Sequence, residues 1–156
     1  MSREDTVRDD LLATFPALEG RITIARERRL WVEVSREEFQ AVLDVLKDRH
    51  GFDFCCTITG LDLGEDLGFV YHLADWHGVV LNLRQRVPKS DPTILSITPR
   101  YPGVIFYERE LVDLLGAKVE GLPPGDRYPL RDDWPEGQYP LRKDWKLEML
   151  PEAWKE

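Results

Sequence analysis

Apolar and polar positions follow helix and strand periods in turn over the first third of the chain. Residues 4–15 carry apolar side chains three and four positions apart and are followed by Pro16, which predicts an N-terminal helix. Residues 22–34 alternate apolar and polar positions, which predicts a hairpin or a strand pair. Ser35 and Glu38 form a capping box, and the apolar stripe after them predicts a second helix that ends near His50.

The next segments favour strands that are joined by tight turns. The predicted strands cover roughly 52–62, 67–75, 78–87 and 94–97. Turn residues fill the gaps at 63–67 and 75–78. Helices and strands are partly segregated along the sequence, so the predicted fold class is α+β, with a mostly antiparallel sheet packed by helices.

A third helix is predicted from Val104 to Leu115, with Gly116 as its terminator. Glu108 lies on the apolar stripe of this helix, where an unpaired carboxylate is costly. We therefore expect a cation opposite Glu108, either Arg142 or Lys143 of this chain or a residue of a partner. Arg109 and Asp113 are four residues apart on another face, a spacing that allows them to pair.

The last 35 residues show almost no regular pattern. Six of the 11 prolines and three of the 5 tryptophans lie between residues 123 and 154. Proline removes backbone donors and disfavours both helix interiors and central strands. We therefore predict a domain over 1–121 and an extended C-terminal arm over 122–156, whose aromatic side chains bury against the domain, against a partner, or against both.

Composition and charge narrow the class of protein. The 156 residues carry a net charge of −8 with a pI near 5.0, which argues against a general nucleic-acid binder. No apolar run approaches the roughly 20 residues of a membrane span, and residues 1–10 show no secretory signal. Cys55 and Cys56 are expected to be buried strand thiols of a protein in a reducing, cytosolic compartment.

No catalytic, cofactor-binding or metal-binding constellation emerges from the residues. The sequence has no glycine-rich phosphate loop and no nucleophile elbow, and its three histidines have no metal-ligand spacing. Glu108 and Glu110 are two residues apart on a helix and face different directions, so they cannot flank one substrate as an acid/base pair.

Two motifs resemble a known protein family. They are ERELVDLLG at 108–116 and PLRKDW at 140–145, and the stretches CTITGLDL, YHLADWHG and SITPRYPG extend the resemblance over roughly residues 30–145. The sequence is similar to the 30 kDa subunit family of proton-pumping NADH-quinone oxidoreductases, the respiratory complex I type of NADH dehydrogenase. That family includes the matching subunit of membrane-bound, energy-converting hydrogenases.

The resemblance implies a non-catalytic assembly subunit on the hydrophilic part of such a complex. It implies that this chain binds no cofactor, and that iron–sulfur clusters, FMN or a NiFe centre belong to partner subunits. The arm is expected to extend over a large 49 kDa-type subunit beside an iron–sulfur subunit, peripheral to the cytoplasmic side of the cell membrane. The expected partner-binding residues are Glu108, Arg109, Glu110, Asp113, Trp134, Pro140, Leu141, Arg142, Lys143, Asp144 and Trp145. Most of them match the family motifs, while Trp134 and Trp145 follow from the aromatic make-up of the arm.

The complex that the chain serves and the class of protein to which it belongs both stay open at this point. The sequence departs from many respiratory members at Tyr107 and over 121–127, and residues 132–145 look closer to the hydrogenase-linked branch. The electron donor and acceptor therefore depend on the partner subunits. A different class is a freestanding small-molecule-binding or enzymatic domain with the arm as its lid, and a third is an interaction module unrelated to respiration.

Overall fold

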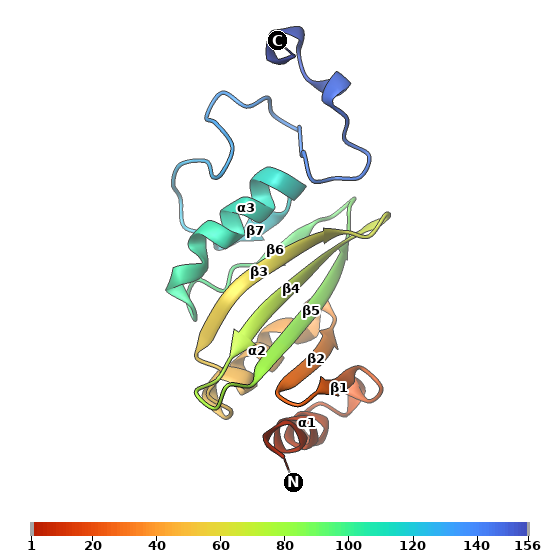
Figure 1. Ribbon diagram of the computed structural model, residues 1–156, viewed down its shortest axis with the longest axis vertical. Helices are drawn as coiled ribbons and strands as arrows, with labels where there is room; N and C mark the ends of the chain where they lie inside the picture. The colour runs from red at the N-terminus through yellow and green to blue at the C-terminus, as the bar shows by residue number, and fades with distance from the viewer. Residues whose placement is uncertain (1, 156) are drawn as a thin grey trace. The chain divides into compact units, whose positions relative to one another are not determined.

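Five strands form the main sheet of the protein, whose computed structural model describes residues 2–155 (Figure 1). The elements in sequence order are α1 (Arg3–Thr14), η1 (Pro16–Leu18), β1 (Ile22–Arg26), β2 (Arg29–Val34), α2 (Arg36–Asp48), β3 (Phe54–Asp62), β4 (Asp66–Ala74), β5 (Val80–Pro88), β6 (Thr93–Leu95), η2 (Pro102–Val104), α3 (Ile105–Leu115), β7 (Lys118–Glu120), η3 (Leu147–Met149) and η4 (Glu152–Trp154). The predicted α+β class is confirmed.

The sheet is mixed, with the strand order β1-β2-β5-β4-β3. The strands β1 and β2 pair antiparallel, as the sequence predicts. The strand β2 then pairs parallel with β5, with Arg29 opposite Val80 and Val34 opposite Gln85. A parallel pair needs a crossover connection, and α2 lies in that connection. A second, two-stranded sheet joins β6 to β7 in parallel.

The helices α1 and α2 begin where the sequence supplies caps. The Ser35 hydroxyl accepts from the Glu38 amide while the Glu38 carboxylate accepts from the Ser35 amide, so the predicted capping box is present. The apolar stripe of α2 is buried. The helix lies against one face of the sheet (Figure 1). Phe39 of this stripe packs on Tyr71 of β4, with ring centroids 4.7 Å apart. A second capping box, from Ser2, opens α1.

The chain divides into two compact units. The first comprises residues 1–59 and 68–86, and the second comprises residues 60–67 and 87–156. No helix among residues 2–155 combines the length and the apolar character that a membrane span requires. The predicted boundary between residues 121 and 122 separates the domain from the segment that we expect to dock on a partner, and it stays a prediction.

The prediction that both cysteines are buried is wrong. Cys55 is half-buried and Cys56 is exposed. The reason is that β3 is the last strand in the order of the sheet, so it has a neighbour on one side only. Most of its side chains are consequently half-buried or exposed.

Candidate docking site

Glu108 is a buried carboxylate of α3, the longest helix of the second unit. Its side chain accepts hydrogen bonds from the Ser96 hydroxyl and the Ile97 amide, each at 2.7 Å. Burial raises the pKa of Glu108, and the two hydrogen bonds partly oppose that rise. A hydroxyl and an amide therefore satisfy this carboxylate in place of the expected cation, because the segment after β6 brings both donors to it.

Asp113 is the second buried carboxylate of α3 and holds the beginning of the arm. It accepts from Arg127 Nε at 3.0 Å and from the Leu130 amide at 3.1 Å. Arg127 also donates to the Trp134 carbonyl, at 2.7 Å. The pairing of Arg109 with Asp113 that the spacing allows is replaced by these contacts, and Arg109 donates instead to the carbonyl of Pro124.

Asp62, at the end of β3, holds the other end of the arm. Its carboxylate accepts from Lys89 Nζ at 2.7 Å and from the Gly64 and Lys143 amides, each at 2.8 Å. Burial acts to raise the pKa of Asp62, but the hydrogen bonds from these three groups outweigh it and lower the pKa to about 2. We call Asp62, Gly64, Lys89 and Lys143 the Asp62 cluster.

Sequence reasoning missed the Asp62 cluster. An available signal was the spacing of Asp62 and Gly64, because aspartate in a turn commonly accepts from the amide two residues on. That signal predicts the turn only. Nothing in the sequence predicts that the Lys143 amide, 81 positions further on, donates to the same carboxylate.

The PLRKD motif caps the C-terminal end of α3. Arg142 Nε donates to the Leu115 carbonyl at 2.7 Å, and the Leu141 amide donates to the Leu114 carbonyl at 3.0 Å. Both carbonyls belong to the last turn of the helix, which lacks partners of its own and favours a cation. The Arg142 guanidinium also lies 4.6 Å from the centre of the Tyr139 ring.

Gly116 makes this approach possible. Its φ of 72° is the left-handed conformation that commonly ends a helix at glycine. A Cβ at this position would lie 2.6 Å from the Tyr139 ring and 2.8 Å from Arg142 Nη2. The predicted terminator is confirmed, and it serves a second purpose by admitting the arm.

Three tryptophans of the arm pack together. The Trp134 ring lies 6.3 Å from Trp145 and 5.4 Å from Trp154, measured between centroids. The Gln138 carbonyl accepts from the Trp134 indole, and the Gln138 side chain accepts from the Trp145 indole. The arm thus builds a small aromatic cluster and needs no other element for it.

The remaining predicted residues lie along the same arm and helix. Glu110 and Pro140 are half-buried, and Lys143 and Asp144 are exposed at their side chains. Leu141 keeps 56% of its surface exposed. The structure therefore brings Asp113, Trp134, Arg142 and Trp145 into intrachain contacts, while Leu141, Lys143 and Asp144 face solvent.

A hollow of about 650 Å³ lies between α3, β7 and the beginning of the arm. It is open to solvent, and its lining includes Arg109, Asp113 and Arg127, which bond to the protein itself. Among residues 2–155, no cluster of three or more histidine, cysteine or carboxylate side chains could hold a metal ion.

Together the fold and the arm define the class of protein: an α+β domain with a proline-rich segment fixed along α3, its last α-helix. Residues 32–150 match the family described as respiratory-chain NADH dehydrogenase, 30 Kd subunit. The chain belongs to this family, as the resemblance implied.

Curated relatives come from several complexes. The C subunit of the Nocardioides NADH-quinone oxidoreductase is 35% identical over 84% of this chain and 57% of its own length. The beta subunit of the membrane-bound hydrogenase of Pyrococcus furiosus is 30% identical over 88% of this chain and 83% of its own length. The C subunit of the F(420)H(2) dehydrogenase of Methanosarcina mazei is 33% identical over 83% and 87%. The chain thus spans little more than half of the first relative and most of the other two.

Two solved structures share the fold. One is part of the membrane-bound sulfane sulfur reductase, an archaeal respiratory membrane complex, with a TM-score of 0.82 and 26% identity over 94% of this chain and 87% of that one. The other is a trypsin-resistant fragment of Nqo5, with a TM-score of 0.67 and 30% identity over 80% of this chain and all of the fragment.

Proposed function

We propose that this chain is a non-catalytic assembly subunit of a membrane-associated electron-transfer complex. The complex is of the NADH-quinone oxidoreductase type or of the membrane-bound hydrogenase type. The arm is the observation that carries this proposal. Its own polar contacts with Asp62, Asp113 and the end of α3 hold it in place, yet Leu141, Leu147 and Met149 are each more than half exposed. Large apolar side chains among charged residues are the composition of a docking surface.

The arm, over 122–156, docks on a large 49 kDa-type subunit that has an iron–sulfur subunit beside it. Iron–sulfur, FMN or NiFe centres lie in those partners, and this chain sits peripherally on the cytoplasmic side of the membrane. The relatives named as subunits of oxidoreductases, hydrogenases and dehydrogenases support this assignment.

The contacts within the chain contribute to docking because they pre-organise the arm. A flexible arm would lose conformational entropy on docking, which weakens binding. Asp62 and Asp113 order the arm before a partner arrives, so that less of this entropy is lost at assembly. Asp62 and Asp113 therefore bond to groups of the protein itself, while the exposed leucines contact the partner.

The test is co-purification from native membranes in mild detergent. The double variant Leu141→Ser/Leu147→Ser should lose most of the large and iron–sulfur subunits that the wild-type chain retains, because each leucine removed from an interface core forfeits about 1–2 kcal/mol of apolar burial. Leu95→Ser, at a leucine of β6 that is 38% exposed, is the matched control and should retain them. Full recovery of both subunits with the double variant would refute docking through this surface.

The hollow beside α3 favours the alternative of a small-molecule site with the arm as lid, since its volume is typical of ligand pockets. Its arginines argue against that use. Arg109 and Arg127 donate to Pro124, Asp113 and Trp134, so an anionic ligand would have to displace contacts that hold the arm. The assembly role accounts for the same contacts without a ligand.

A further inference from the structure

Two exposed turns lie side by side at one end of the main sheet, within the first unit. They are the β1–β2 turn at 26–29 and the β4–β5 turn at 75–79. The Val80 amide donates to the Arg28 carbonyl at 3.0 Å, and Arg29 is opposite Val80 in the parallel pair. The sheet register therefore fixes the two turns next to each other.

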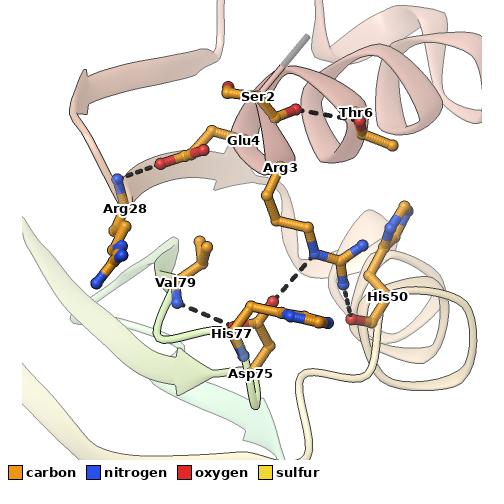
Figure 2. Close-up of polar contacts among 9 residues, drawn as sticks. All are labelled: Ser2, Arg3, Glu4, Thr6, Arg28, His50, Asp75, His77 and Val79. Atoms are coloured by element: carbon orange, nitrogen blue, oxygen red, sulfur yellow. Dashed lines mark hydrogen bonds and ion pairs between the residues drawn. The ribbon is translucent and has the colours of Figure 1, made fainter.

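Glu4 fixes the β1–β2 turn from the beginning of α1. The side chain of this buried residue accepts from the Arg28 amide, as Figure 2 shows. Arg28 has a φ of 59°, in the left-handed region that residues other than glycine rarely adopt. A buried carboxylate thus stabilises an unfavourable backbone conformation at a residue whose own side chain is exposed.

Asp75 fixes the β4–β5 turn, and its side chain is only 1% exposed. It accepts from the His77 and Val79 amides at 2.9 Å each, and from Arg3 Nε at 3.1 Å (Figure 2). Arg3 also donates to the carbonyl of His50. Two adjacent residues of α1, Arg3 and Glu4, therefore hold the two turns rigid.

The rigid turns display one tryptophan of an aromatic pair and a basic cluster. Trp76 is 77% exposed and packs edge-on against Phe54, which is 39% exposed, with ring centroids 4.5 Å apart. A shallow hollow beside the turns is lined by Arg26, Glu27, Arg28, Arg29 and Gly78. Three arginines against one carboxylate make the exposed lining of this hollow basic, since the Glu4 and Asp75 carboxylates are buried, although the net charge of the whole sequence is −8.

We propose a second docking surface, a patch that is separate from the arm and consists of Arg26, Arg28, Arg29, Phe54 and Trp76. Its occupant is an acidic segment of another protein subunit. Carboxylates of that segment pair with the arginines, and an apolar side chain covers the Phe54–Trp76 pair. Tryptophan and arginine dominate the energy of protein interfaces, and rigid turns lose little entropy on binding. Arginine is better suited than lysine to bind carboxylates.

The charges favour a protein segment over other occupants. An anionic membrane or a nucleic acid would meet a protein of net charge −8, which repels both beyond the patch itself. A second copy that docked through the same patch about a two-fold axis would bring arginines against arginines. A short acidic segment of a different subunit can lie within the patch, where it meets little of the negative charge elsewhere, and it brings no arginines against arginines.

A photo-crosslinking amino acid at position 76 tests the proposal in the full chain within the detergent-purified native complex. The expected product joins position 76 to one stretch rich in aspartate and glutamate in another subunit. The same probe at Glu37, an exposed position on α2, is the control and should not reach that stretch. A cross-link to a second copy, to a stretch without excess carboxylates, or to lipid alone in an intact complex would overturn the proposal. If the complex stays intact while any of these results is obtained, the proposed docking role of the arm is unaffected.

Arg28→Asn supplies the charge test, because asparagine tolerates a positive φ and the turn should persist. The yield of the cross-link from position 76 should fall about tenfold, the factor that corresponds to one charge-assisted hydrogen bond. Arg28→Lys keeps the charge and should retain more of the yield than Arg28→Asn, but less than the native arginine. Equal yields in the asparagine and lysine variants, with thermal unfolding unchanged, would show that the arginine charge plays no part and would overturn the acidic-segment assignment.

Discussion

Replacement of Asp62 by asparagine is the sharpest test of how the arm is held. Asparagine would keep the size of the side chain and one acceptor oxygen, but it would lose the negative charge. In the native protein one oxygen, Oδ2, accepts both from Lys89 Nζ and from the Lys143 amide. The Asp62→Asn variant would therefore leave Lys89 without its buried counter-charge and weaken the attachment of the PLRKD motif.

The magnitude follows from the pKa of Asp62. This pKa falls from 3.8 to about 2 in the folded protein. Since one pKa unit corresponds to about 1.4 kcal/mol, the folded state favours the ionised carboxylate by on the order of 2 kcal/mol. The side chain is only 2% exposed, so solvent screens these contacts little. We expect Asp62→Asn to lower the free energy of unfolding by about 2 kcal/mol at neutral pH.

The effect also has a defined pH window. The folded pKa of Asp62 is lower than the unfolded one, so the carboxylate stabilises the protein fully above about pH 4 and loses this contribution as the pH falls through about 2. The difference in unfolding free energy between wild type and Asp62→Asn should therefore be constant from about pH 5 to 8 and vanish in strong acid.

Urea unfolding and amide hydrogen exchange measure the two parts of this prediction. The Lys143 amide should exchange faster in Asp62→Asn than in wild type, because its acceptor is weaker. Asp144→Asn is the matched control, since Asp144 lies 3.9 Å from Lys89 Nζ but its side chain is 71% exposed. If both variants lost the same stability, or if Lys143 exchange did not change, the assignment of Asp62 as the group that holds the arm would be refuted.

Two further substitutions test α3 and its end. Glu108→Gln removes a carboxylate whose pKa is raised by burial, so ionisation of Glu108 destabilises the wild-type fold as the pH rises above 4.5. The Tm of the variant relative to wild type should therefore be higher at about pH 8 than at about pH 5. An equal difference in Tm at both pH values would contradict the reasoning. Gly116→Ala should lower the unfolding free energy by more than about 1 kcal/mol, because the left-handed backbone and the contact with Tyr139 both oppose a Cβ. Gly137→Ala, at φ 74° with no atom within 4 Å of the added Cβ, carries the backbone cost alone and should lose less in chemical denaturation.

Local chemistry determined which parts of this structure the sequence could predict. The Ser35 capping box, the stripe of α2 and the glycine after α3 depend on neighbours within a few residues, and all three are present. The β2–β5 pairing depends on segments about fifty residues apart, and periodicity carries no information on which strands pair.

The candidate site likewise combines local features that the sequence predicts with long-range contacts that it does not predict. The burial of Glu108 follows from its place on an apolar stripe, but its partners do not, because Ser96 lies on a separate segment that the fold brings to it. Likewise, the composition of the arm predicted that its tryptophans need cover. It could not predict that Trp134 finds this cover in Trp145 and Trp154 of the same arm.

The parallel pairing of β2 with β5 imposes an order on biogenesis. As the protein leaves the ribosome, β1 can cover one side of β2 at once, but the other side has no partner until residues 80–88 have been made. At about 5–20 residues per second, β2 waits on the order of several seconds with unpaired backbone groups along one edge. A nascent chain stalled before residue 80 would keep that edge open, and such chains are the ones for which chaperone capture and aggregation compete most directly with folding.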